Sequence, residues 1–268
     1  MAGPVANMAN IWKKPFKYTP PSPPAELVVS TSYTIDFTNR KFVHIGIDPT
    51  ENFQVVIHLI TSSRYIKISP DFLKRIFSLM GNILSFILEQ PEKYKRRLFL
   101  ETEFNKLSSM MYTGENVLVI ESKNQEGCRI LLNRSDLIQL QYLEWCIFET
   151  VTRKLTIIRP VVLRQFETIG NYLDQEFTNV ESPPKTNEEM IVFIKNLSDD
   201  KIIGFAPKEE MNFISQLKIN ATIQLAEYWA RRWNGGNSPE LFIEPGAYSS
   251  MSPCYDEDDD SQARVIYN

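Results

Sequence analysis

Two kinds of hydrophobic pattern occur along this 268-residue chain, and each predicts a different type of element. Between residues 27 and 133, short runs rich in Val, Ile, Thr, Tyr and Phe are separated by turn residues such as Asp-Pro-Thr, Ser-Ser and Thr-Gly, which is typical of β-strands. These runs predict strands at 27–37, 41–47, 53–60, 64–68, 96–102, 104–112, 117–122 and 128–133.

Apolar residues at helical spacing follow the fourth and the eighth run. Ser69 can cap the first helix and Pro70 suits its first position, so we expect a helix over 70–90. Ser135 or Asn133 can cap the second, which we expect to extend to about residue 154. The expected apolar faces are Phe72, Ile76, Leu79, Ile83 and Ile87 in the first helix, and Leu137, Leu140, Ile147 and Val151 in the second.

The rest of the chain predicts further helices between polar segments. Helical periods occur over 155–177, 187–197 and 207–233, and Gly235-Gly236 ends the last of them. "SPPK" at 182–185 is typical of a linker. The N-terminal segment has five prolines between Ile11 and Pro24, and "YDEDDD" near the C-terminus is too charged to bury.

The two strand-and-helix stretches show the same order of elements. A shift of 64 residues pairs Glu51-Asn52 with Glu115-Asn116, and after one inserted residue a shift of 65 pairs Arg64 with Arg129 and Asp71 with Asp136. Identity is low and coincidence is an alternative, but similarity at a fixed offset indicates a structural repeat.

These patterns predict an α+β fold, in which a duplicated antiparallel sheet-plus-helix unit is followed by a helical C-terminal region. The helices at 70–90 and 135–154 carry extra large residues (Phe86, Trp145 and Phe148), so we expect them to pack against each other or against a second copy. The expected divisions are a disordered Pro-rich arm at 1–25, a first unit at 26–92, a second unit at 93–155, a helical region at 156–236 and an acidic disordered tail at 237–268.

Composition narrows the protein class. A hydrophobic fraction of 43% and an aromatic fraction of 12% are those of a globular protein. Cys128, Cys146 and Cys254 are odd in number and widely spaced, so we expect free thiols in a reducing compartment, nuclear or cytoplasmic, and no secretion. No signal peptide is expected, and the apolar run 76–88 is too short to span a membrane.

Catalytic and cofactor motifs are not found in the sequence. It has no GxGxxG or Walker-type GK[ST] motif and no Cys/His metal spacing, so we expect no enzyme activity and no cofactor. Core packing is the favoured role for Cys128, Cys146, His44 and His58.

Charge is distributed unevenly along the chain. Residues 1–165 hold 21 Lys and Arg against 15 Asp and Glu, whereas residues 166–268 hold 8 against 18. Such asymmetry is typical of a polyanion-binding region beside an acidic tail, although ordinary surface composition can also produce it. The candidate nucleic-acid-binding residues are Arg64, Tyr65, Lys67, Lys95, Arg96, Arg97, Phe99 and Arg129. In this interpretation the cations hold phosphates, while Tyr65 and Phe99 stack on bases; a solubilising surface is the alternative.

Strands followed by a basic strand and an amphipathic helix, as in "RYIKISPDFLKRIF" and "CRILLNRSDLIQLQYLEW", resemble the positive-cofactor-four family of transcriptional coactivators. The duplicated plan is also similar to the Whirly proteins, although their lysine-glycine-lysine signature is absent. The resemblance covers roughly residues 27–155 and implies sheets that bind single-stranded DNA, with helices that build a homo-oligomer. Two fused units would then form a pseudo-dimer within one chain.

The leading hypothesis is therefore a protein of replication or transcription that binds single-stranded DNA or RNA, and a viral origin is one option. The rival hypothesis is a structural or assembly protein that makes mainly protein contacts, and an enzyme of unfamiliar type is a third. The acidic tail can compete for the basic surface or recruit a protein partner, or it can simply aid solubility. No membrane partner is expected.

Overall fold

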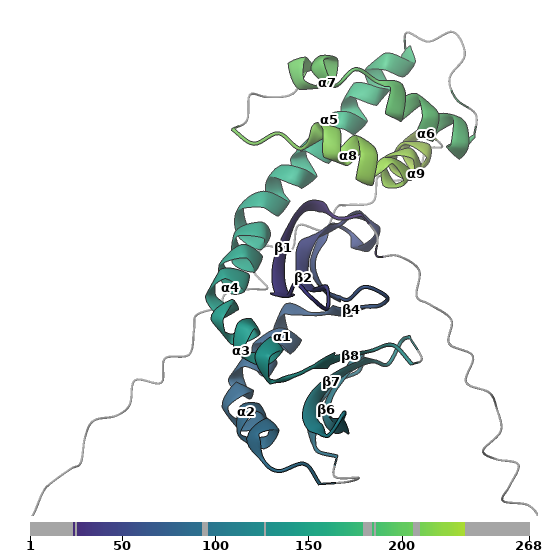
Figure 1. Cartoon of the computed structure of the whole chain (residues 1–268). Coiled ribbons are helices and arrows are strands. Elements are labelled where there is room, and N and C mark those ends of the chain that lie inside the picture. Colours follow the sequence, from purple (N-terminus) through teal and green to yellow (C-terminus); the bar gives the residue numbers. More distant parts are fainter. Residues whose placement is uncertain are drawn as a thin grey trace, which may run out of the picture. The chain divides into compact units, whose positions relative to one another are not determined.

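The computed structural model describes residues 24, 26–92, 96–125, 127–178, 184, 186–205 and 210–233. The Pro-rich arm before Pro24, Lys95 and the acidic tail lie outside these residues. The expected fold class is confirmed, because two antiparallel sheets each precede a pair of short helices and a helical region follows (Figure 1). No helix in the described ranges is long and apolar enough to cross a membrane.

Both sheets are four-stranded meanders in which each strand pairs with the next along the chain. All eight strands predicted from the sequence are present in the described residues. The first sheet contains β1 (Val28–Asp36), β2 (Lys41–Asp48), β3 (Gln54–Ile60) and β4 (Tyr65–Ile68). The second contains β5 (Leu98–Glu101), β6 (Asn105–Tyr112), β7 (Glu115–Ser122) and β8 (Arg129–Leu132).

The apolar residues of each sheet line up in register on the face that the helices cover. Ile45 pairs with Ile57, and Ile57 pairs with Ile68, so these side chains form one row across the first sheet. All three are at most 1% exposed. In the second sheet, Leu118 and Leu132 form the matching row and are fully buried. Such rows follow from the two-residue period of a strand, which sends alternate side chains to the same face.

The helices that follow each sheet are divided where the sequence predicted continuous ones. Leu79 separates α1 (Pro70–Ser78) from α2 (Met80–Leu88), and Leu143 separates α3 (Arg134–Tyr142) from α4 (Glu144–Arg153). The predicted cap at Ser69 is present, since its side chain accepts a hydrogen bond from the Phe72 amide. Asn133, not Ser135, caps α3, and it forms a capping box with Asp136.

The repeat is present, but its register differs from the predicted one. β2, β4, α1 and α2 each begin 64 residues before β6, β8, α3 and α4, so no residue is inserted before the helices. Tyr65 therefore corresponds to Arg129, and Arg64 corresponds to Cys128. The pairing of Glu51 with Glu115 is also wrong, because Glu51 lies in a 3-10 turn (Pro49–Glu51) whereas Glu115 opens β7.

Each unit contributes to the packing of the other. The Phe77 ring of α1 meets the Phe148 ring of α4 edge-on at 5.4 Å, which confirms the expected packing of the two helix pairs. Asn116 in β7 donates to the carbonyls of Phe86 and Glu89, which end α2. Trp145 does not take part in the way expected from its size, because its side chain is 60% exposed.

A nearly continuous helical segment connects the second unit to the C-terminal helices. A π-helical turn (Lys154–Ile158) joins α4 to α5 (Arg159–Thr178) without the boundary predicted near residue 155. Pro160 lies just after this turn and has no N–H for a preceding carbonyl, a situation that a wider turn accommodates.

The C-terminal helices are α6 (Asn187–Asn196), α7 (Asp199–Phe205), α8 (Ile214–Asn220) and α9 (Thr222–Trp233). α6 was predicted and α7 was not. The single helix predicted over 207–233 is divided at Ala221 into α8 and α9, and residues 206–209 lie outside the described part of the chain.

Candidate nucleic-acid interface

The free edge of β4 lies against the second sheet. Two alternate carbonyls on this edge accept hydrogen bonds from side chains of the other unit: Cys128 Sγ donates to Tyr65 O at 3.1 Å, and Asn105 Nδ2 donates to Lys67 O at 3.3 Å. Burial raises the pKa of the Cys128 thiol, which keeps it in the protonated, donating form. These contacts satisfy an edge that would otherwise present unpaired backbone groups, and they bring the ends of both sheets together.

Basic side chains from both sheets gather where these edges meet. Arg64 Nη1 lies 3.4 Å from the Arg129 carbonyl oxygen, and the two residues line one small hollow of about 310 Å³. Lys106 and Lys123 join Arg129 in the adjoining hollow, of about 490 Å³. We refer to Arg64, Lys106, Lys123 and Arg129 as the basic cluster.

Strand register explains why two of these cations, Lys106 and Arg129, lie close together around Glu121. Lys106 pairs with Glu121 across β6 and β7, and Glu121 pairs with Arg129 across β7 and β8, so the three side chains share the outer face. Lys123 forms an ion pair with Glu101 at 2.8 Å. Among the described residues, the basic cluster therefore has four cations beside two carboxylates, Glu101 and Glu121.

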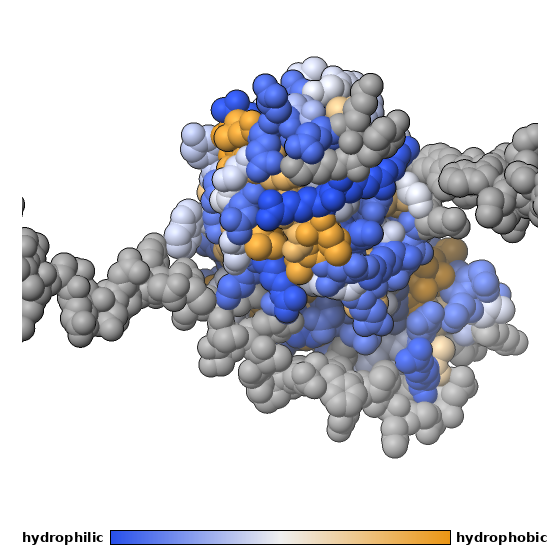
Figure 2. Space-filling model, turned by 90° about the horizontal axis from the view of Figure 1, so that it is seen from below, coloured by the Kyte–Doolittle hydropathy of each residue, from blue (hydrophilic) through white to orange (hydrophobic). Residues whose placement is uncertain are grey.

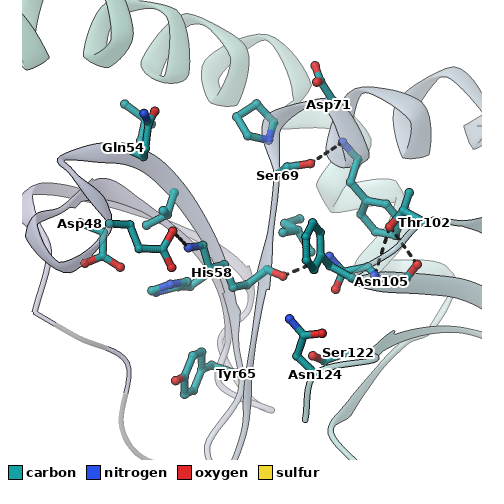
Figure 3. A pocket seen from close by; sticks show the side chains of 18 of the residues that line it. Asp48, Gln54, His58, Tyr65, Ser69, Asp71, Thr102, Asn105, Ser122 and Asn124 are labelled. Carbon is teal, nitrogen blue, oxygen red and sulfur yellow. Dashed lines mark hydrogen bonds and ion pairs between the residues drawn. The ribbon is translucent and has the colours of Figure 1, made fainter. Parts of the chain in front are cut away.

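A larger cleft of about 730 Å³ lies beside the basic cluster, and Ser122 lines both (Figure 3). One wall comes from β3 and β4, with His58 and Tyr65. The other comes from the β5–β6 turn and the β7–β8 loop, with Asn105 and Asn124 (Figure 3). The cleft thus joins residues that are about 60 positions apart in the sequence.

The cleft has both polar and apolar lining residues, and it is not basic. Asp48, Glu51 and Asp71 supply three carboxylates, whereas Lys67 and Arg75 supply two cations. Lys67 already forms an ion pair with Glu51. A phosphate group is therefore better matched to the basic cluster than to the cleft.

His58 forms part of the cleft wall and is neutral at physiological pH. It is 3% exposed, and burial lowers its pKa to about 4, with Asp48 opposing the shift and His44 and Lys67 adding to it. Its ring lies 5.4 Å from the Tyr65 ring. The wall therefore offers an uncharged imidazole beside an aromatic side chain.

The structure places the predicted site residues in two groups. Arg64, Tyr65, Lys67 and Arg129 lie at the cleft or the basic cluster, although Arg64 and Arg129 are neighbours and not equivalent points of the repeat. Arg96, Arg97 and Phe99 lie at the start of β5. The members of this second group that contact α2 are Phe99, whose ring packs edge-on against Phe86, and Arg97, which lies over both rings. Phe99 does not line the cleft.

Sequence reasoning missed Lys106, Lys123, Phe104 and Asn105 as site residues. The Thr113-Gly114 turn could have identified the first of them, since a two-residue hairpin loop fixes the register that puts Lys106 opposite Glu121. Phe104 is a 54% exposed aromatic in the cleft wall. Its position, like that of Lys123, depends on where the second sheet meets the first.

The prediction that the cysteines and histidines pack in the core is correct for some of them and wrong for Cys146. Cys128 and His58 are buried as expected, and both described cysteines are free thiols. Cys146 is exposed, so its expected core role is wrong, and Cys254 lies outside the described residues. Within the described ranges, no group of three or more His, Cys, Asp or Glu residues could hold a metal ion.

No family model matches this sequence, and no curated protein matches it.

Proposed function

We propose that this protein binds single-stranded nucleic acid where its two sheets meet. The observation that carries the proposal is the approach of Arg64 to Arg129, which brings cations of both repeat units to one surface beside an aromatic-walled cleft. Phosphates would bind at the basic cluster, and bases would contact Tyr65 and Phe104. Proteins that bind single strands combine these two features, a positively charged path for the backbone and aromatic side chains for the bases.

The surface fits a single strand better than a duplex. Bases of a single strand are free to enter a cleft and stack on aromatic rings, whereas those of a duplex are already paired and stacked. The cleft is lined mainly by strands and loops, together with a 3-10 turn and the N-terminal half of α1, so it does not present a long helix that could enter a major groove.

The test is the salt dependence of binding to a fluorescent 20-nucleotide single strand, measured by anisotropy. Wild-type affinity should fall steeply with salt, because phosphate neutralisation releases counterions. The double variant Arg64→Ala/Arg129→Ala should bind about tenfold or more weakly and show a smaller salt slope.

A matched control is Lys195→Ala/Lys201→Ala, which removes the same charge from exposed positions on α6 and α7. It should retain most of the affinity if the basic cluster, and not net charge alone, is responsible. Equal losses in both double variants would contradict the proposed location. Failure of the wild-type protein to bind at low salt would reject the function.

An assembly role is the second candidate, and exposed apolar side chains favour it. Figure 2 shows the molecule from the end at which α2 and the second sheet lie in Figure 1, where apolar side chains form a patch bordered by hydrophilic ones. Leu88 of α2 and Leu98 of β5 are more than half exposed, as is Trp145 of α4. Patches of this kind commonly mark protein contacts, including contacts with a second copy.

A further inference from the structure

Unpaired polar atoms are concentrated in the cleft. Among the described residues that line this cleft, three buried side-chain atoms have no hydrogen-bond partner: His58 Nδ1, Asn105 Oδ1 and Gln125 Oε1. Buried polar groups are nearly always paired, since leaving one unpaired destabilises the folded protein. Three at one cavity therefore point to a ligand that completes them.

The orientation of Asn105 identifies what kind of partner is needed. Its Nδ2 donates to Lys67 O at 3.3 Å, so turning the amide over would lose that hydrogen bond. Oδ1 is therefore left as an acceptor. Gln125 Oε1 is a second acceptor, and the carboxylates of Asp48 and Asp71 also line the cleft. The unpaired amide oxygens of Asn105 and Gln125 need donors, so a ligand that donates hydrogen bonds is favoured.

The charge and shape of the cleft further limit which ligands fit it. The cleft holds more carboxylates than cations, which disfavours a phosphate, and Phe104 and Tyr65 give it two aromatic side chains. Its volume of about 730 Å³ is within the usual range of small-ligand sites. A flat, uncharged ring with a hydrogen-bond donor at its edge fits these conditions.

We infer that the cleft holds one nucleobase of the bound strand and prefers a base with an exocyclic amino group, an inference that rests on the proposed function. Adenine, cytosine and guanine carry such a group, and it donates to the unpaired acceptors of Asn105 and Gln125. Uracil and thymine present a carbonyl where cytosine presents its amine, so an acceptor faces an acceptor. The phosphates on either side of this base reach the basic cluster, which adjoins the cleft at Ser122.

The decisive comparison uses two oligonucleotides that differ only at this edge of the base. Full-length protein is titrated with fluorescent 12-nucleotide deoxycytidine and deoxyuridine strands at pH 7.5 and one fixed salt concentration. The deoxycytidine strand should bind at least about fivefold more tightly, the lower end of the discrimination that a specific base contact gives.

Variants then test whether the preference for deoxycytidine arises from residues of the cleft. Gln125→Leu should bring the ratio of the two affinities close to one while changing deoxyuridine binding little. Asn105→Leu should act in the same direction, with its melting temperature measured because it also loses the bond to Lys67 O. Gln90→Leu is the matched control, since Gln90 is an exposed residue between α2 and β5, and it should keep the wild-type ratio.

The outcomes separate this inference from the proposed function. Equal affinities, or tighter deoxyuridine binding, would overturn the base preference and leave single-strand binding intact. A wild-type preference that survives in both Gln125→Leu and Asn105→Leu would overturn its assignment to the cleft. Binding of neither strand would reject the proposed function and the inference with it.

Discussion

The connection between β2 and β3 in the first sheet spans residues 49–53, whereas its counterpart in the second sheet is the two-residue turn Thr113-Gly114. The longer connection docks on α5, because the Phe53 ring lies 4.8 Å from the Phe166 ring and Arg159 Nε donates to Phe53 O at 2.8 Å. The short turn has positive φ at both residues, the geometry of a tight hairpin turn. The β2–β3 connection therefore packs against the helical region, whereas the equivalent connection in the second unit only reverses the chain direction.

The outer edge of the first sheet is also fastened to other parts of the chain. Val29 in β1 has a φ of +51°, its amide donates to Gln216 of α8 at 2.9 Å, and its carbonyl accepts from Lys154 in the π-helical turn. Asn220 adds a bond to Leu27 O at 3.2 Å. These bonds cover backbone groups that an edge strand otherwise exposes.

The outer faces differ as well. In the first sheet, paired positions hold His44, His58 and Lys67, whereas the matching row of the second sheet holds Ser108, Val119 and Leu131. The comparison shows that the two units share strand order and core register, while their edges, turns and outer faces differ. The first sheet packs against the helical region, and the second sheet supplies most of the basic cluster.

The largest expected effect concerns the β2–β3 connection, which packs against α5. Phe53→Ala should lower the free energy of unfolding by about 3 kcal/mol, because Phe53 is 2% exposed and its removal leaves a cavity against α5. Tyr112→Ala, at the corresponding hairpin of the second sheet, is the control. Its side chain is 55% exposed, so the loss should stay below about 1 kcal/mol. Urea unfolding curves measure both, and equal losses would remove the difference between the two hairpins.

The next effect concerns acid stability and the outer face. Unfolded His58 takes up a proton near pH 6.5, whereas the folded protein does so only near pH 4, where burial has moved its pKa. The free energy of unfolding should therefore fall by up to about 3 kcal/mol as the pH drops through this window, and the contribution is fully present above pH 6.5.

His58→Val introduces the residue that the second sheet has at the equivalent position, Val119. The variant should lose this part of the pH dependence, with a flatter stability profile between pH 6.5 and 4. Urea unfolding at half-unit pH steps gives the profile. A slope unchanged from wild type would show that other groups cause the acid sensitivity.

The smallest effect concerns the ion pair of Lys67 with Glu51. Both side chains are more than a third exposed, so solvent screens their attraction and the pair should contribute less than about 1 kcal/mol. Lys67→Leu copies the second sheet, which has Leu131 at this position, and Glu51→Gln breaks the same pair from the other side. Thermal melting compares the two variants. A loss above 2 kcal/mol in either would mean that the pair fastens the β2–β3 connection.

Local pattern was sufficient for much of the fold. Alternation of apolar residues predicted the strands, and the helical period predicted the buried faces of α1 to α4, such as Leu137 and Ile147. Both signals depend on near neighbours in the chain, so they can be read without the tertiary structure. The repeat could be predicted for the same reason. Because the identity between the two units is low, the predicted alignment of their helices was wrong by one residue.

For the candidate site, residue type and strand pattern were enough to select four of the residues that lie there, Arg64, Tyr65, Lys67 and Arg129. Three other facts come from long-range packing: Arg64 touches Arg129, Asn105 closes the edge of β4, and Phe99 belongs to the contact with α2. The first two facts depend on how one sheet edge meets another across about 40 to 65 residues of chain, and the third depends on how β5 packs against α2. Strand propensity and periodicity describe the pleat of a single strand and carry no information about its non-local partners.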